Sequence, residues 1–334
     1  MENENTKIPL IVVAGPTAAG KSECAVELAR RIGGEIISAD SMQVYRHMDT
    51  GSAKITLEEM MGIPHYMIDV ADPSESFDVA RFKEMAKGYV HEIHARGHIP
   101  ILCGGTGFYI QAVTRDIDFT DTFADPDYRN ELLSYAEKNG ADALHSRLAA
   151  VDPCAAEQIH PNNMKRVIRA LEFYRETGNK ISDHNEAEKQ RETPYDLLFF
   201  VISEARKTLY ERIDRRVDFM MEEGLLDEVA YLRAMGLRRD MVSMQGLGYK
   251  EMLDVLDGKI PYEEGVRILK RDTRHFAKRQ LTWFRRERDA RWIDRADFGG
   301  DSIKIAEYMA ETAQRELKIA VHDPSPIPGH AGRA

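Results

Sequence analysis

IPLIVVAGPTAAGKS, residues 8–22, joins a continuous apolar run to a glycine-rich segment that ends in Lys-Ser. The apolar part, residues 8–14, is typical of a strand buried on both faces of a parallel sheet. Residues 15–22 match G-x-x-x-x-G-K-[ST], and helical sequence follows as far as residue 31. Between a strand and a helix, such glycines let successive backbone N–H groups point inward at phosphate oxygens. We therefore predict a phosphate-binding P-loop.

Each part of this loop has an expected role. The N-terminus of the following helix adds positive potential, Lys21 supplies a point charge, and Ser22 offers a hydroxyl ligand to Mg²⁺. Most loops of this kind bind ATP or GTP, so the motif alone favours a kinase or an NTPase. The residues expected to hold the phosphate groups are Gly15, Pro16, Thr17, Ala18, Ala19, Gly20, Lys21 and Ser22.

Further apolar strands are predicted at 35–38, 99–103 and 197–202, and a helix at 77–96 with Ser76 or Ser74 as its N-cap. Strands alternating with helices indicate an α/β fold with a doubly wound parallel sheet, like that of P-loop NTPases. Residues 118–192 are charged and helical in pattern, and 206–317 are mainly helical. We predict the first part of the core at 1–117, a helical insertion at 118–193, core completion with a helical basic C-terminal region at 194–320, and a disordered tail at 321–334.

The composition of the chain indicates its cellular compartment and the kind of partner it could bind. The chain has 334 residues, a net charge of −10 and three well-separated cysteines, so a disulfide framework or a cysteine zinc site is not expected. We expect a protein of the reducing cytoplasm with no membrane association. Residues 267–295 nevertheless hold eleven Lys or Arg against four Asp or Glu. Such a basic segment on an acidic protein can bind a polyanion.

Two polar positions follow predicted strands and should face the same crevice, at the carboxyl ends of the sheet. Asp40 could hold Mg²⁺ through water, accept a proton as a general base, or cap the following turn. Thr106, in the run Gly104 to Gly107, could hydrogen-bond a leaving-group oxygen or serve only the turn. Neither residue identifies a substrate by itself.

In order along the chain stand GPTAAGKS, ISADSMQVYR, MDTGSAK, FDVARF, PILCGGTGFYI, IHPNNMKRVIRALE, ERIDRRVDFMMEEGL, GLGYKE and AKRQLTWFRR. With these motifs, residues 9–290 closely resemble the bacterial tRNA dimethylallyltransferase family, also called tRNA isopentenyltransferases. The resemblance implies transfer of a dimethylallyl group from dimethylallyl diphosphate to N6 of the adenosine 3′ of the anticodon, in tRNAs that read U-initial codons, with release of pyrophosphate. Eukaryotic relatives often carry a C-terminal zinc finger, and the resemblance is to the zinc-free form.

The resemblance also implies residue roles. The loop would cradle the donor's diphosphate with Mg²⁺ on Ser22, and Asp40 would be the general base that takes the N6 proton. Thr106 would hydrogen-bond the bridging oxygen, and Arg216, with Arg212 as the alternative, would be a second diphosphate clamp.

A tRNA anticodon stem-loop is the implied macromolecular partner, bound by a monomer whose reaction requires the adenine to leave the stack. Lys165, Arg166 and Arg169 would share one side of a helix of the insertion. Trp283, among cations, suits base stacking. The complete set of expected tRNA-binding residues is Asp40, Ser41, Met42, Gln43, Lys165, Arg166, Arg169, Gln245, Gly246, Gly248, Tyr249, Lys250, Lys278, Arg279, Gln280, Trp283 and Arg285.

Three other hypotheses stay open. An adenylate isopentenyltransferase would act on a free nucleotide, but a mononucleotide needs neither the insertion nor the basic C-terminal region. A P-loop kinase of small metabolites would require an arginine lid segment, which the sequence does not reveal. A non-catalytic RNA-binding protein would not require Asp40 and Thr106.

Overall fold

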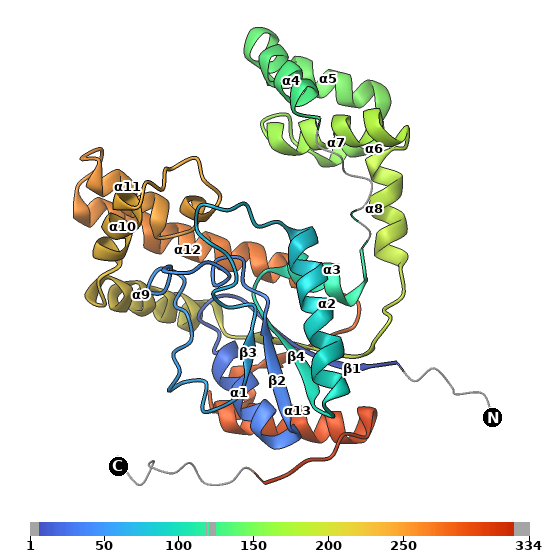
Figure 1. Cartoon of the computed structure of the whole chain (residues 1–334), viewed down its shortest axis with the longest axis vertical. Coiled ribbons are helices and arrows are strands. Elements are labelled where there is room, and N and C mark those ends of the chain that lie inside the picture. The colour runs from blue at the N-terminus through green and yellow to red at the C-terminus, as the bar shows by residue number, and fades with distance from the viewer. Residues whose placement is uncertain (1–6, 118, 120–124, 324–334) are drawn as a thin grey trace, which may run out of the picture. The chain divides into compact units, whose positions relative to one another are not determined.

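Six parallel strands form one sheet in the order β3-β2-β4-β1-β5-β6 (Figure 1). The structure is a computed structural model and describes residues 7–117, 119 and 125–323. The strands β1, β4 and β5 in the middle of the sheet are mostly apolar, as is typical of parallel strands covered on both faces. The strands are β1 (Pro9–Ala14), β2 (Gly34–Ser38), β3 (His65–Tyr66), β4 (Ile99–Gly104), β5 (Asp196–Ser203) and β6 (Ala290–Asp294).

The chain divides into two units. The first contains residues up to Thr114 and from Pro194 onward, and the second is Arg115–Thr193. The range 118–193, for which a helical insertion is predicted, lies within the second unit. The tail predicted to be disordered lies, from residue 324 onward, outside the described residues. Across the residues that the structure describes, no helix has both the length and the apolar character needed to span a bilayer.

Helices cover both faces of the sheet in the first unit (Figure 1). Because side chains alternate along a strand, Ile11 and Val13 of β1 pack on the face covered by α1 and α13. Leu10 and Val12 pack on the opposite face, with α2 and α3. The helices of this unit are α1 (Lys21–Ile32), α2 (Val79–Ala95), α3 (Gly107–Thr114), α9 (Arg206–Glu222), α10 (Leu225–Ala234), η1 (Ser243–Gln245), α11 (Tyr249–Leu256), α12 (Tyr262–Phe284), η2 (Arg295–Phe298) and α13 (Ser302–Leu317).

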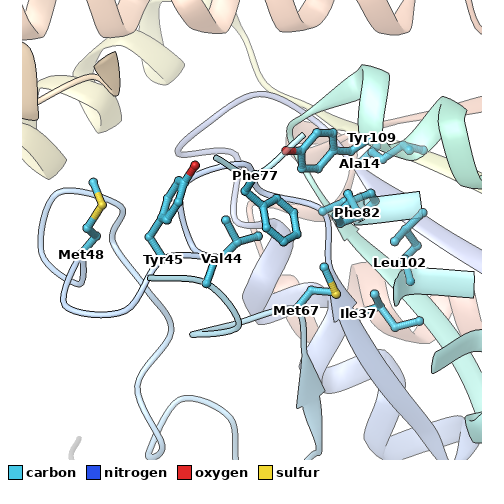
Figure 2. Close-up of a cluster of buried hydrophobic side chains, with 14 of the residues drawn as sticks. Ala14, Ile37, Val44, Tyr45, Met48, Met67, Phe77, Phe82, Leu102 and Tyr109 are labelled. Atoms are coloured by element: carbon cyan, nitrogen blue, oxygen red, sulfur yellow. The ribbon is translucent and has the colours of Figure 1, made fainter. Parts of the chain in front are cut away.

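The core on the α2 face supports the loops above the sheet. Figure 2 shows Met67, Phe77 and Phe82 beside Ile37 of β2 and Leu102 of β4. The Phe82 ring stacks on that of Tyr109 with centroids 4.1 Å apart. Since the backbone N–H of Tyr109 donates to the Thr106 carbonyl at 2.9 Å, this packing fixes the turn after β4.

Two short strands were not predicted, and one N-cap prediction was wrong. Strand β6 lies in the region predicted to be mainly helical, because only Ile293 of ARWID is buried and the apolar signal of a strand is lost. The two-residue strand β3 was missed because it is too short to carry a pattern. Helix α2 is capped neither by Ser76 nor by Ser74: its N-cap is Asp78, whose carboxylate accepts from the backbone N–H of Arg81 at 2.9 Å.

The second unit is a bundle with its own apolar core, which includes Leu132, Leu144, Leu148 and Ile168. A buried carboxylate adds a polar anchor: Glu172 accepts two hydrogen bonds from Arg129, both at 2.8 Å. The helices are α4 (Pro126–Asn139), α5 (Ala141–Val151), α6 (Pro153–Gln158), α7 (Met164–Thr177) and α8 (Ile181–Gln190).

Candidate active site

The segment between β1 and α1 has the conformation that its glycines permit. Gly15 has φ 152°, and a Cβ there would lie 2.5 Å from the Ile202 carbonyl oxygen. Gly20 has φ 80° and is the N-cap of α1, so the first turn of α1 begins directly at Lys21. The loop closes on itself through a hydrogen bond from Ala19 N–H to the Pro16 carbonyl at 3.3 Å. The helix N-terminus thus faces the loop's interior, as an anion site requires.

Lys21 is held at the mouth of this loop, where its ammonium donates to the Pro16 carbonyl at 2.7 Å. Burial lowers the pKa of Lys21 from 10.5 to about 8. The nearby Arg216 guanidinium lowers this pKa as well, whereas Cys103 and Asp40 act in the opposite direction. A bound anion would favour the charged ammonium and offset this desolvation, so the site is arranged for a negative ligand.

A cavity of about 460 Å³ opens above the carboxyl ends of β1, β2 and β4. Lys21 of the P-loop, Asp40 after β2, Thr106 after β4 and Arg216 of α9 all line it. The four residues come from four separate segments of the chain. The structure therefore brings together the residues predicted for donor binding and for proton transfer.

Asp40 and Thr106 are oriented by backbone groups. The Asp40 Oδ1 accepts from Met42 N–H at 2.9 Å. The Thr106 Oγ1 accepts from Ser41 N–H at 3.2 Å, while Thr106 N–H donates to the Ala39 carbonyl at 3.1 Å. Because the Thr106 hydroxyl accepts from the backbone, its own proton is available to a ligand in the cavity.

Of the two arginines proposed as diphosphate clamps, only Arg216 lines the cavity. Arg216 lines the cavity, and burial lowers its pKa, opposed by the nearby carboxylates Asp40 and Glu59. Arg212, one turn earlier on α9, donates through Nε to the Ala18 carbonyl at 2.8 Å and does not line the cavity. The geometry favours Arg216 as the clamp and gives Arg212 a contact with the loop backbone.

Gln280 of α12 has a role that the sequence did not reveal. Its Oε1 accepts from Thr17 N–H and its Nε2 donates to the Gly105 carbonyl, both at 2.9 Å. The side chain is buried and joins the P-loop to the turn that carries Thr106. Gln280 also lines the cavity, and its expected tRNA contact stays a prediction. A residue 263 positions from Thr17 in the sequence offers no local signal for such a bridge.

Most other residues expected to bind RNA near the reaction centre do line the cavity. Tyr249 does not: its side chain is fully buried and donates its hydroxyl to Glu228 at 2.8 Å, so the structure does not bring this side chain to the cavity. Gly248 is the N-cap of α11, where φ is 93°. The expected residues that line the cavity are Asp40, Ser41, Met42, Gln43, Gln245, Gly246, Lys250, Arg279 and Gln280.

The remaining expected RNA contacts are surface groups of two separate units. Lys278 and Arg285, at the C-terminal half of α12 and just after it, are exposed. Trp283 is half-buried, with its ring edge-on to Phe108 at 6.1 Å. In the second unit, helix α7 carries Lys165 and Arg166, both exposed, and Arg169, which is partly buried.

The fold and cavity define an α/β enzyme core with a P-loop-like anion site. Comparison with known proteins gives the family. The family model described as IPP transferase matches residues 43–287. A tRNA dimethylallyltransferase of Lachnoclostridium phytofermentans is 52% identical over 309 residues, which cover 92% of this chain and 99% of that protein.

Two solved structures with similar folds point to the same family. The full-length tRNA isopentenylpyrophosphate transferase of Bacillus halodurans is 47% identical with a TM-score of 0.70, over 93% of this chain and 99% of the other. A eukaryotic dimethylallyltransferase, captured acting on tRNA, is 30% identical with a TM-score of 0.78, over 96% of this chain and 82% of the other. The chain belongs to the IPP transferase family and is a prenyltransferase, which confirms the predicted family, fold class and enzyme class.

Proposed function

We propose that this chain transfers the dimethylallyl group of dimethylallyl diphosphate to N6 of the adenosine 3′ of the anticodon, in tRNAs that read U-initial codons, and releases pyrophosphate. The observation that carries the proposal is the single cavity lined by Lys21, Arg216, Asp40 and Thr106. Two cations suit a diphosphate, and a carboxylate beside them suits removal of a proton from an acceptor. The tRNA in the names of the similar proteins supports the choice of acceptor.

The reaction exchanges one bond for another. A C–N bond forms between N6 and C1 of the dimethylallyl group, and the C1–O bond breaks with its electron pair going to the diphosphate. Lys21 and Arg216 stabilise the negative charge that builds on the leaving group. The Thr106 hydroxyl donates to the bridging oxygen, because the bond from Ser41 N–H orients its oxygen and leaves its proton free for the ligand.

Asp40 receives the proton that N6 loses. Its Oδ1 is held by Met42 N–H, which orients the carboxylate toward the cavity. An exocyclic adenine amine is a weak nucleophile, so placement beside the donor and loss of the proton both lower the barrier. Proton transfer to a positioned group contributes about 10²- to 10⁴-fold in rate.

Mg²⁺ is proposed as the cofactor. The described residues contain no group of three or more His, Cys, Asp or Glu that could cage a metal, but Mg²⁺ usually takes few protein ligands and completes its shell with water and substrate phosphates. The Ser22 hydroxyl lines the cavity and fits that role. When bound, the ion would help to neutralise the diphosphate.

We further propose that the chain works as a monomer in the cytoplasm. The unit Arg115–Thr193 is proposed to contact the anticodon stem-loop through Lys165, Arg166 and Arg169. Contacts nearer the reaction centre are proposed for the cavity residues named above and for the exposed cations and Trp283 around the end of α12.

Transfer of label tests this function. The enzyme is incubated with Mg²⁺ and radiolabelled dimethylallyl diphosphate, with an anticodon stem-loop or AMP as acceptor, and separately with labelled ATP and a metabolite pool. Label in the RNA alone is the expected result. Label on AMP alone would establish an adenylate prenyltransferase, and transfer of phosphate from ATP without prenyl transfer would establish a kinase.

A further inference from the structure

Three charged side chains lie against the P-loop without lining the cavity. Glu204 follows β5, Arg212 belongs to α9, and Arg295 begins η2. The Glu204 carboxylate lies 3.6 Å from Arg295 Nε and 4.0 Å from Arg212 Nη1, so one carboxylate joins the two guanidinium groups. These three residues are called the loop brace below.

Both guanidinium groups of the loop brace hold backbone carbonyls of the P-loop. Arg212 Nε donates to the Ala18 carbonyl at 2.8 Å, and Arg295 Nη1 donates to the Ala19 carbonyl at 3.3 Å. They also pack directly on Gly20, where an added Cβ would overlap Arg295 and lie 3.4 Å from Arg212 Nη2. The loop can therefore keep this conformation only with a glycine at position 20.

Because the peptide bond between Ala19 and Gly20 is planar, the contact on the Ala19 carbonyl also orients the Gly20 N–H. The carbonyl of one residue and the N–H of the next point in opposite directions across the peptide plane. Because Arg295 holds the Ala19 carbonyl on the side of the brace, the Gly20 N–H is turned the other way. An N–H so directed is one of the donors that a P-loop presents to an anion.

Arg295 is itself firmly held. It is 3% exposed, its Nη1 lies 3.3 Å from Ser302 Oγ, and its Nη2 donates to the Gly300 carbonyl. The Ser302 hydroxyl in turn donates to Glu23 of α1 at 2.6 Å. The brace thus joins the segment after β6 to the loop and to the first helix, which preorganises the loop before a ligand binds.

We propose that Arg295, acting with Arg212 and Glu204, is a positioning residue that orients the P-loop for the diphosphate of the prenyl donor. The inference rests on the proposed diphosphate site. It assigns to the brace an effect on donor affinity that is separate from RNA affinity, because none of its three members lines the cavity.

The test compares Arg295→Lys and Arg295→Met with wild type, and uses Arg291→Lys as the matched control. Arg291 lies on β6 and pairs with Glu316 away from the loop. The KM for dimethylallyl diphosphate and the KM for the stem-loop are measured separately, together with binding of inorganic pyrophosphate and the unfolding midpoint. Loss of a buried charged hydrogen bond should weaken donor and pyrophosphate binding about 10- to 100-fold in Arg295→Met and change the RNA KM by no more than about twofold. The donor and pyrophosphate affinities of Arg295→Lys should lie between those of Arg295→Met and wild type, and those of the control should match wild type.

Glu204→Gln is the second variant, because it removes the joining charge without a change in size, and the same donor-specific weakening is expected. Lys21→Ala tests the diphosphate site separately from the positioning role of the loop brace. If Lys21→Ala keeps wild-type donor affinity, the diphosphate site itself is misplaced. If Lys21→Ala loses donor affinity while folded Arg295 and Glu204 variants keep it, or if those variants lose donor and RNA affinity equally, the positioning role is refuted.

Discussion

Replacing Asp40 by asparagine removes the proposed base and little else. Asparagine has nearly the same shape, and its Oδ1 can still accept from Met42 N–H, the bond that aspartate makes at 2.9 Å. The turn that positions Ser41 against Thr106 should therefore survive. What the variant loses is the ability to accept the proton from N6.

The expected loss is large and confined to the chemical step. Positioned proton transfer contributes about 10²- to 10⁴-fold, which is about 2.7–5.4 kcal/mol of transition-state stabilisation. Single-turnover transfer from labelled dimethylallyl diphosphate to the stem-loop measures this step, and pyrophosphate binding measures the donor site. We expect transfer to fall by that factor while donor affinity stays near that of wild type.

The matched control is Asp240→Asn, because Asp240 is exposed, pairs with Arg238 and does not line the cavity. It should transfer at the wild-type rate. A folded Asp40→Asn enzyme that also transfers at the wild-type rate would refute the base assignment. A variant whose main defect is in donor binding would move Asp40 to the metal or diphosphate site.

Three further predictions concern the scaffold. Gln280→Leu leaves the Thr17 N–H and the Gly105 carbonyl without partners, at about 1–3 kcal/mol each, so the unfolding midpoint should fall and the donor KM rise; unchanged values in denaturation and steady-state kinetics would contradict the bridge. Phe82→Ala, at a fully buried ring, should lower the free energy of unfolding by about 3–5 kcal/mol in chemical denaturation, and a loss near zero would contradict the packing described. Although burial raises the pKa of Glu35, hydrogen bonds from Arg96, Tyr66 and His98 lower it overall below 4.5. Its stabilising contribution is therefore present above pH 4.5 and is lost as the pH falls through the folded-state pKa. Glu35→Gln should be less stable than wild type at pH 7, and its free energy of unfolding should fall less as the pH is lowered. Parallel plots of the free energy of unfolding against pH for the two proteins would contradict this account.

The strands that position the site were predictable because they are buried on both faces. The runs that became β1, β4 and β5 are apolar without interruption, Asp40 follows β2, and Thr106 follows β4. Position after a strand was enough to place both side chains at one edge of the sheet. The P-loop was predictable from its own spacing.

What escaped prediction depends on contacts between distant segments. Gln280 and Arg295 act on the P-loop from more than 250 residues away, and neither lies in a pattern that local chemistry explains. Tyr249 stands in a motif that suggested RNA contact, yet its environment is a buried hydrogen bond to Glu228. Strand β6 lacks the apolar run by which the other strands were found, because it lies at the sheet's edge.

The central claim is that an adenosine N6 amine, in RNA, receives the dimethylallyl group in the cavity of Lys21, Asp40, Thr106 and Arg216. Two anticodon stem-loops test it, identical except that one carries adenosine 3′ of the anticodon and the other inosine, which has no amine at C6. After incubation with dimethylallyl diphosphate and Mg²⁺, digestion and mass analysis should find one prenylated adenosine, at that position, in the first RNA and none in the second. Equal modification of both RNAs, or modification of neither by a folded enzyme that binds the donor, would contradict the account.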